Sequence, residues 1–289
     1  MATTEKSPVH KVILFIAAGM LLLACGDKTQ KDENESTAIN DSVSVETTEI
    51  NNVFYSLPSP LQIASIFKKS GLKYQDDITT TFKDPSKYTT KLSKSLNLGI
   101  YSADLAYCVL NKQNQEAMNY MKLCRQMADK LGIGTVFEER NLSQRFEKNI
   151  GNEDSLAYII AELQMVTDIY LDENEQPEIT AIVFSGAWLE SLYLGSKLYE
   201  KTKDKPMNAK LTEQMTILGS IINALKAVEK NDPGIPGLIA DIQSIKDIYD
   251  ELPSVKNSAG EDDKEQVITL MDEEVLKLTK KISELRTKF

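Results

Sequence analysis

Apolar positions recur at helical spacing along most of the chain after the first 58 residues. In the segment 92–110 the small and apolar residues are separated by four, three, four, three and four positions: Leu92, Leu96, Gly99, Ala103, Ala106 and Leu110. This spacing places them on one face of an amphipathic helix. Glycine and proline fall mainly between such segments, and no stretch has the strict alternation of a strand. The pattern predicts an all-α fold, an antiparallel helical bundle of about nine helices with short connections.

Capping signals give approximate bounds for the predicted helices. Ser59-Pro60 and Asp84-Pro85 are start signals, and Gly132 is a stop signal. The helices are expected at about residues 60–70, 85–111, 114–131, 135–149, 152–171, 178–201, 208–230, 238–251 and 262–288. The helix at 178–201 has apolar residues on more than one face, so it is predicted to lie at the centre of the bundle.

The first 24 residues have the pattern of a secretory signal peptide. Lys6, His10 and Lys11 precede an uncharged run from Val12 to Ala24, which is too short to span a bilayer. The run ends in Leu22-Leu23-Ala24-Cys25, which resembles the lipobox of bacterial lipoprotein signal peptides. The resemblance implies that Cys25 is lipidated, that residues 1–24 are removed, and that the new amino group is acylated. An uncleaved anchor and an ordinary signal peptide are the alternatives.

Residues 25–52 are predicted to form the lipidated cysteine and a disordered acidic tether, and residues 53–289 the helical domain. Residues 26–52 contain no aromatic side chain and have no apolar periodicity, so they cannot bury enough surface to fold. The acidic patch Lys31-Asp32-Glu33 resembles surface-export signals of some gram-negative lipoproteins. The expected location is the cell envelope, as an outer membrane lipoprotein facing the periplasm or the cell surface. A merely soluble acidic linker is the alternative reading of the patch.

Composition restricts the possible partners and chemistry. The chain has 33 basic and 43 acidic residues. It has only four arginines, so no basic surface for nucleic acid is expected. The single histidine is His10 in the predicted signal, so a mature protein has no histidine for a catalytic triad, for general base catalysis or for metal binding. No cofactor and no metal site is predicted. The predicted partners are the membrane, through the lipid anchor, and an unknown protein or small molecule.

Two predicted helices share a local pattern that suggests a candidate pocket. One contains Gly99, Tyr101 and Asp104, and the other contains Gly186, Trp188 and Glu190. Glycine inside a helix often marks a close helix crossing, and an acid in an apolar run needs a partner. The candidate pocket residues are therefore Tyr101, Asp104, Trp188 and Glu190.

The alternative is that these two acids lie on solvated helix faces. Asp104 falls on a polar stripe with Thr90, Asn97 and Asn111, which are spaced by seven residues. Glu190 likewise lies seven residues before Lys197, which would place both on one polar face of their helix. Tyr101 and Trp188 would then be ordinary core aromatics.

The same segment resembles a motif of imelysin-like helical lipoproteins. Gly99-x-Tyr101-x-x-Asp104 has the spacing of the glycine-x-histidine-x-x-glutamate motif of that family, with tyrosine and aspartate in place of the two ligand types. The lipobox, the stretch LNLGIYSADLAY and the stretch GAWLESLYLG together resemble a group of uncharacterised all-helical lipoproteins of gram-negative bacteria. This second resemblance implies location and fold, and no activity.

These observations favour a lipid-anchored helical protein outside the cytoplasm that binds or scaffolds and is not an enzyme. One alternative is a histidine-free hydrolase that uses Asp104 and Glu190 as acid and base, which requires an open cleft between two carboxyl groups roughly 5–9.5 Å apart. The other is a structural subunit of an envelope complex, which requires an exposed apolar face.

Overall fold

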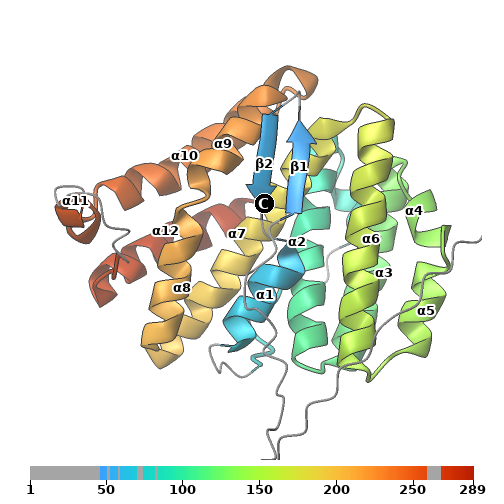
Figure 1. Ribbon diagram of the computed structural model, residues 1–289, viewed down its shortest axis with the longest axis horizontal. Helices are drawn as coiled ribbons and strands as arrows, with labels where there is room; N and C mark the ends of the chain where they lie inside the picture. The colour runs from blue at the N-terminus through green and yellow to red at the C-terminus, as the bar shows by residue number, and fades with distance from the viewer. Residues whose placement is uncertain (1–45, 51–52, 58, 70–73, 82–83, 259–267) are drawn as a thin grey trace, which may run out of the picture. The chain divides into compact units, whose positions relative to one another are not determined.

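The computed structural model describes residues 46–50, 53–57, 59–69, 74–81, 84–258 and 268–289 (Figure 1). The predicted signal peptide, Cys25 and the tether as far as residue 45 lie outside the described residues. The predicted all-α fold is confirmed, because the described residues form a bundle of helices with one short hairpin. The helices are α1 Pro60–Lys69, α2 Lys91–Leu110, α3 Asn114–Leu131, α4 Thr135–Glu138, α5 Leu142–Lys148, α6 Glu153–Glu173, α7 Pro177–Thr202, α8 Lys205–Met215, α9 Leu218–Ala227, α10 Ile235–Asp250, α11 Pro253–Ser258 and α12 Asp272–Lys288.

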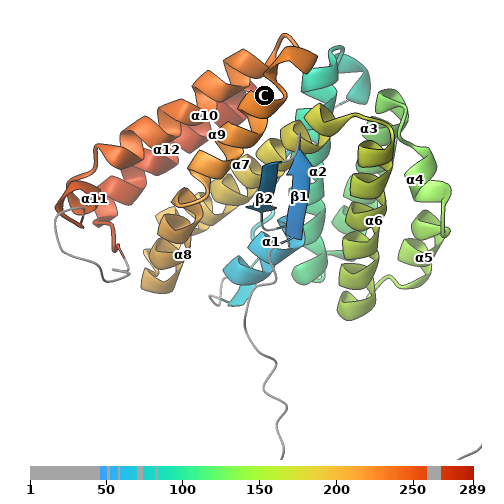
Figure 2. The ribbon, with the colours of Figure 1, turned by 45° about the horizontal axis from the view of Figure 1, so that its top comes forward.

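Helices α2 and α7 form the central pair. Helix α2 also contacts α1, α3 and α6, whereas α7 also contacts α1, α6, α8, α9 and α12. Figures 1 and 2 show α3–α6 on one side of this pair and α8–α12 on the other. The core is divided in the same way, into one apolar cluster built largely from α2–α6 and a second built largely from α7–α12 and α1. The prediction that the helix at 178–201 is central is confirmed, since most residues of α7 are buried on all sides.

Local side-chain chemistry explains where helix boundaries differ from the predicted ones. Asp84 caps only a short 3-10 turn, η1 Pro85–Lys87, and α2 begins at Lys91, six residues after the predicted start at residue 85. Its start is a capping box in which the side chain of Thr90 accepts from the backbone N–H of Ser93 and the Ser93 side chain bonds back. The structure also confirms α3 with the predicted bounds, and it ends at Gly132 in the left-handed region.

Two predicted helices are each broken in two. The helix expected at 135–149 is interrupted by Arg140 and Asn141, which have φ values of 55° and 53° and so cannot continue a right-handed helix. The helix expected at 208–230 is interrupted near Thr216, whose hydroxyl donates to the carbonyl oxygen of Glu213 at 2.7 Å. Such a side-chain bond competes with the regular backbone hydrogen bonds of the helix. A second 3-10 turn, η2 Glu229–Asn231, follows α9.

A two-stranded antiparallel hairpin precedes the helices and was not predicted. Strand β1 Glu46–Ile50 pairs with β2 Val53–Leu57, from Glu46 opposite Leu57 to Ile50 opposite Val53. Strand β1 lies in the segment that the sequence analysis assigned to the tether, and β2 lies beside α9.

No helix within the described ranges is long and apolar enough to cross a membrane.

Candidate functional site

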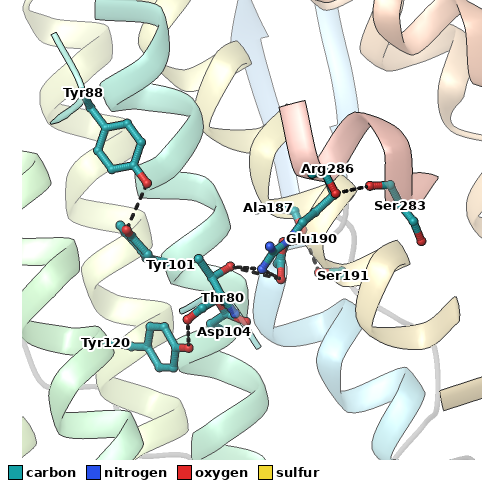
Figure 3. A network of polar contacts seen from close by, with 11 residues as sticks. Thr80, Tyr88, Tyr101, Asp104, Tyr120, Ala187, Glu190, Ser191, Ser283 and Arg286 are labelled. Atoms are coloured by element: carbon teal, nitrogen blue, oxygen red, sulfur yellow. Dashed lines mark hydrogen bonds and ion pairs between the residues drawn. The ribbon is translucent and has the colours of Figure 1, made fainter. Parts of the chain in front are cut away.

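The crossing of α2 and α7 brings Asp104 and Glu190 together. Each acid lies about one turn beyond a glycine at which the two helices touch, and both side chains are 0% exposed. Thr80, in the loop before η1, bridges them (Figure 3). Its backbone N–H donates to Asp104 Oδ2 at 3.1 Å, and its hydroxyl donates to Glu190 Oε1 at 3.3 Å. The two carboxyl groups therefore share one polar neighbour in the interior of the bundle.

Arg286 supplies the countercharge from the last turn of α12. Its Nε donates to Glu190 Oε2 at 3.0 Å and its Nη2 donates to Glu190 Oε1 at 3.2 Å, so the ion pair is bidentate. The guanidinium also donates to the Thr80 hydroxyl and lies 4.8 Å from the centre of the Tyr193 ring. We name Thr80, Asp104, Glu190 and Arg286 the acid cluster.

Burial and charge give the two acids different protonation states. Desolvation raises the pKa of Asp104 well above its ordinary value, and the neighbouring negative charge of Glu190 raises it further. Desolvation also raises the pKa of Glu190, but Arg286 opposes this rise by favouring the charged form. A hydrogen bond from the Asp104 carboxyl group favours charged Glu190 as well. The pKa values of both acids are therefore raised, that of Asp104 the more, so Asp104 is the acid of the pair that holds a proton more readily.

The solvated-face interpretation of the two acids is wrong. Asn97, on the same stripe as Asp104, is also buried, with its Nδ2 donating to the Ser93 carbonyl oxygen at 2.9 Å. Lys197 pairs with Glu200 and not with Glu190. The polar stripe of α2 therefore faces the interior where it crosses α7.

The other two candidate pocket residues do not join the acid cluster directly. Tyr101 is fully buried in the cluster of α2–α6, where its hydroxyl lies 3.2 Å from that of Tyr88 and its ring centre 6.2 Å from that of Tyr120. Tyr120 then donates to the Thr80 carbonyl oxygen at 2.6 Å (Figure 3). Trp188 is fully buried in the opposite apolar cluster. The four predicted residues are thus divided between the acid cluster and two separate cores.

Sequence reasoning missed Thr80 and Arg286, which complete the acid cluster. Arg286 did carry a signal, because it follows Ile282 by four residues and so occupies the apolar face of α12, where a charge needs a buried partner. Thr80 lies in a threonine triplet with no distinguishing pattern. Its position depends on tertiary contacts of the loop.

The geometry of the acid cluster bears on the hydrolase alternative. The carboxyl groups are adjacent, as an acid–base pair requires, but neither has any exposed surface. Arg286 and Thr80 occupy both oxygen atoms of Glu190, and Thr80 occupies Oδ2 of Asp104. In the part of the chain that the structure describes, no group of three or more histidine, cysteine, aspartate or glutamate side chains is placed to hold a metal ion.

A cavity lies beside the α2–α7 crossing. Its volume is about 100 Å³, and its walls come mainly from α2, α3, α6 and α7. The apolar lining includes Leu98, Leu105, Ile133, Phe137, Ile160 and Leu163. The polar lining is Ser102, Gln164, Thr167, Asp168 and Thr180. None of the four predicted pocket residues lines it, so the cavity is a site separate from the acid cluster.

A comparison of the chain with protein-family models, curated proteins and solved structures finds no significant match.

Proposed function

We propose that this chain is a lipid-anchored binding protein of the bacterial cell envelope, an outer membrane lipoprotein whose helical domain takes a small apolar group into the cavity between α2, α3, α6 and α7. The proposed anchor is Cys25. The cavity is the observation that carries the binding role, and the lipobox-like sequence carries the location.

The chemistry of the cavity walls suggests what it binds. An apolar cavity of roughly 150 Å³ in a protein interior stays dry and accepts benzene or xenon. The cavity here has about 100 Å³ and a mostly aliphatic lining, which suits a short branched alkyl group or the end of an acyl chain. The polar residues Gln164, Thr167 and Asp168 lie together on α6, where they suit a more polar remainder of the ligand.

Xenon and benzene are the probes that test the cavity. Either probe should shift the methyl NMR signals of Ile133 and Ile160, which line the cavity, and leave those of Ile242 and Ile245 in the other core unchanged. Ala128→Leu should fill the cavity and abolish the shifts, because Ala128 is a buried lining residue. Ala161→Leu is the control, since Ala161 is exposed on α6 and lines nothing. Wild-type protein without probe-dependent shifts, or equal binding by Ala128→Leu, would overturn the binding site.

The anchor is tested separately in cells. Wild-type protein should incorporate an alkyne-labelled fatty acid and fractionate with membranes, and Cys25→Ala should lose both properties or accumulate as precursor. Cys124→Ala is the control, because Cys124 is a buried free thiol inside the bundle. Processing and membrane association of Cys25→Ala at wild-type levels would contradict the lipoprotein assignment.

A further inference from the structure

The acid cluster joins two peripheral segments to the central helix pair. Asp104 belongs to α2 and Glu190 to α7, whereas Thr80 belongs to the loop segment 74–81 and Arg286 to the last turn of α12 (Figure 3). These segments lie about 200 residues apart in the chain and meet where the Arg286 guanidinium donates to the Thr80 hydroxyl. The attachment of both segments at this point depends on the pattern of charges on the buried Asp104 and Glu190 and on the largely buried Arg286.

That pattern contains two fully buried carboxyl groups and one guanidinium. Arg286 balances Glu190, so the interior is neutral only while Asp104 is protonated. The other titratable groups facing the acids are Tyr107 and Cys108 on α2, Tyr120 and Cys124 on α3, and Tyr193 on α7.

None of the buried phenols and thiols among these groups ionises in the ordinary pH range. Burial raises the pKa of Tyr107 to about 12 and that of Cys124 to about 12, and it raises the pKa of Cys108 and Tyr120 further. These groups therefore supply no charge that could compensate for ionised Asp104.

We propose that the acid cluster is a proton-controlled latch, in which a proton shared by Asp104 and Glu190 holds the loop segment 74–81 and the last turn of α12 against α2 and α7, and loss of that proton releases them. With two buried negative charges and one guanidinium, the closed arrangement carries an uncompensated charge. Hydration of the ionised carboxyl groups lowers the free-energy cost of this charge. Water reaches them most easily when the loop segment 74–81 and the last turn of α12 move away.

The covering segments are a loop and the end of the last helix, both outside the central helix pair. Helices α2 and α7 touch at two glycines and cannot separate without losing both cores. The loop segment 74–81 contains no helix or strand and is held by side-chain contacts. Tyr74 stacks on Tyr107 with ring centres 5.4 Å apart, the Gln75 N–H donates to the Tyr107 hydroxyl at 2.9 Å, and Ile78 fills a small apolar cluster. Segments with few buried contacts open locally before the whole domain unfolds.

The direction of the pH effect follows from which state binds the proton. The closed state binds the proton more tightly than the open, hydrated state, so rising pH favours opening. Between the pKa of the open, hydrated pair and the higher pKa of the closed pair, opening releases one proton, so the opening equilibrium rises about tenfold per pH unit and levels off above the pKa of the closed pair. Opening exposes the carboxyl groups of Asp104 and Glu190 to solvent.

Hydrogen exchange of the full-length chain tests the latch. Exchange of the amides in 74–81 and 283–289, corrected for intrinsic chemical rates, should accelerate with rising pH between 5 and 9 in wild-type protein, whereas amides in the middle of α2 should not. Asp104→Asn imitates the protonated acid, because it is neutral and of the same shape and its amide oxygen can still accept from the Thr80 N–H. This variant should remain closed across the whole pH range.

Two further variants separate a latch from a merely structural contact. Asp76→Asn removes an exposed acid from the same loop and should keep the wild-type pH profile. Glu190→Gln leaves Asp104 to balance the charge of Arg286, so opening should no longer increase with rising pH. A wild-type profile without pH-dependent opening between pH 5 and 9, or an Asp104→Asn profile equal to that of wild type, would overturn the proposal.

Discussion

Gly99 of α2 and Gly186 of α7 each lie directly against the backbone of the other helix. A Cβ atom on Gly99 would stand 1.9 Å from the carbonyl oxygen of Val183, and one on Gly186 would stand 2.1 Å from the carbonyl oxygen of Leu96. Backbone atoms cannot yield as a flexible side chain does, so any larger residue must push the helices apart. The two glycines thereby set the distance at which Asp104 and Glu190 meet.

Alanine at either glycine should therefore destabilise the bundle. We expect Gly99→Ala and Gly186→Ala to lower the free energy of unfolding by about 1–3 kcal/mol or more, the usual cost of overpacking. Gly219 in α9 and Gly237 in α10 are the controls, because a Cβ there would meet nothing within 4 Å. Alanine at these two helical positions should be neutral or stabilise by up to about 1 kcal/mol. Urea denaturation of the four variants measures the difference, and equal effects at all four positions would contradict the crossing.

The sequence contained enough information to predict the central part of the fold. Seven-residue apolar spacing identified α2, the all-round apolar pattern identified α7 as central, and glycines inside both helices indicated the crossing. These features are local, so a single segment displays them. The pairing of Asp104 with Glu190 could be suggested for the same reason, since each acid follows a glycine at a similar distance.

Features that depend on contacts between distant segments were not predictable in this way. The break at Arg140 and Asn141 involves left-handed residues other than glycine, which sequence propensity does not favour. There Arg140 and Arg145 reach the same carboxylate, that of Glu162. Thr80 and Arg286 become part of the acid cluster only when the loop and the last helix pack on α2 and α7. The strand pattern in residues 53–57 was too short to stand out beside the polar stretch before it.

Leu189 tests the central position of α7. Its side chain is buried in the apolar cluster of α7–α12, and we expect Leu189→Ala to cost about 2–5 kcal/mol of unfolding free energy. Leu276→Ala is the matched control, because Leu276 lies on α12 with its side chain exposed and should shift stability by less than about 0.5 kcal/mol. A thermal midpoint of Leu189→Ala equal to that of the control would place this face of α7 at the surface.

Glu190 and Arg286 should behave as a coupled pair. Glu190→Gln leaves a largely buried guanidinium without its hydrogen-bonded carboxylate, and breaking a buried pair in this way costs about 3–5 kcal/mol. Adding Arg286→Met to Glu190→Gln removes the unpaired charge, so the double variant should be more stable than the sum of the two single effects predicts. Chemical denaturation of the four proteins in this cycle measures the coupling. Strict additivity would show that the ion pair contributes nothing in the folded bundle.

Glu162 should determine how the stability of the fold depends on pH in the acidic range, whereas Asp104 should determine it at higher pH. Arg145 Nη2 lies 2.8 Å from Glu162 Oε2 and Arg140 Nη1 donates to Oε1 at 3.1 Å. Hydrogen bonding from Arg145 and then Arg140 lowers the pKa of Glu162 below its ordinary value of 4.5. A lowered pKa in the folded state gives stability that is present above the ordinary value and is lost as the pH falls towards the folded value. Asp104 has a raised pKa, so its folded state gains stability at low pH and loses it as the pH rises.

Thermal midpoints measured from pH 3 to pH 9 should therefore separate the two residues. Glu162→Gln should flatten the fall in stability below about pH 4.5 and leave the alkaline side unchanged, because it removes only the acid-side titration. Asp104→Asn should flatten the decline at higher pH and leave the acid side unchanged. Glu138→Gln is the control for the first variant, since Glu138 pairs with Arg125 at an exposed position and should change neither side. If Glu162→Gln and Glu138→Gln give the same curve, the paired arginines do not stabilise the α4–α5 junction through Glu162.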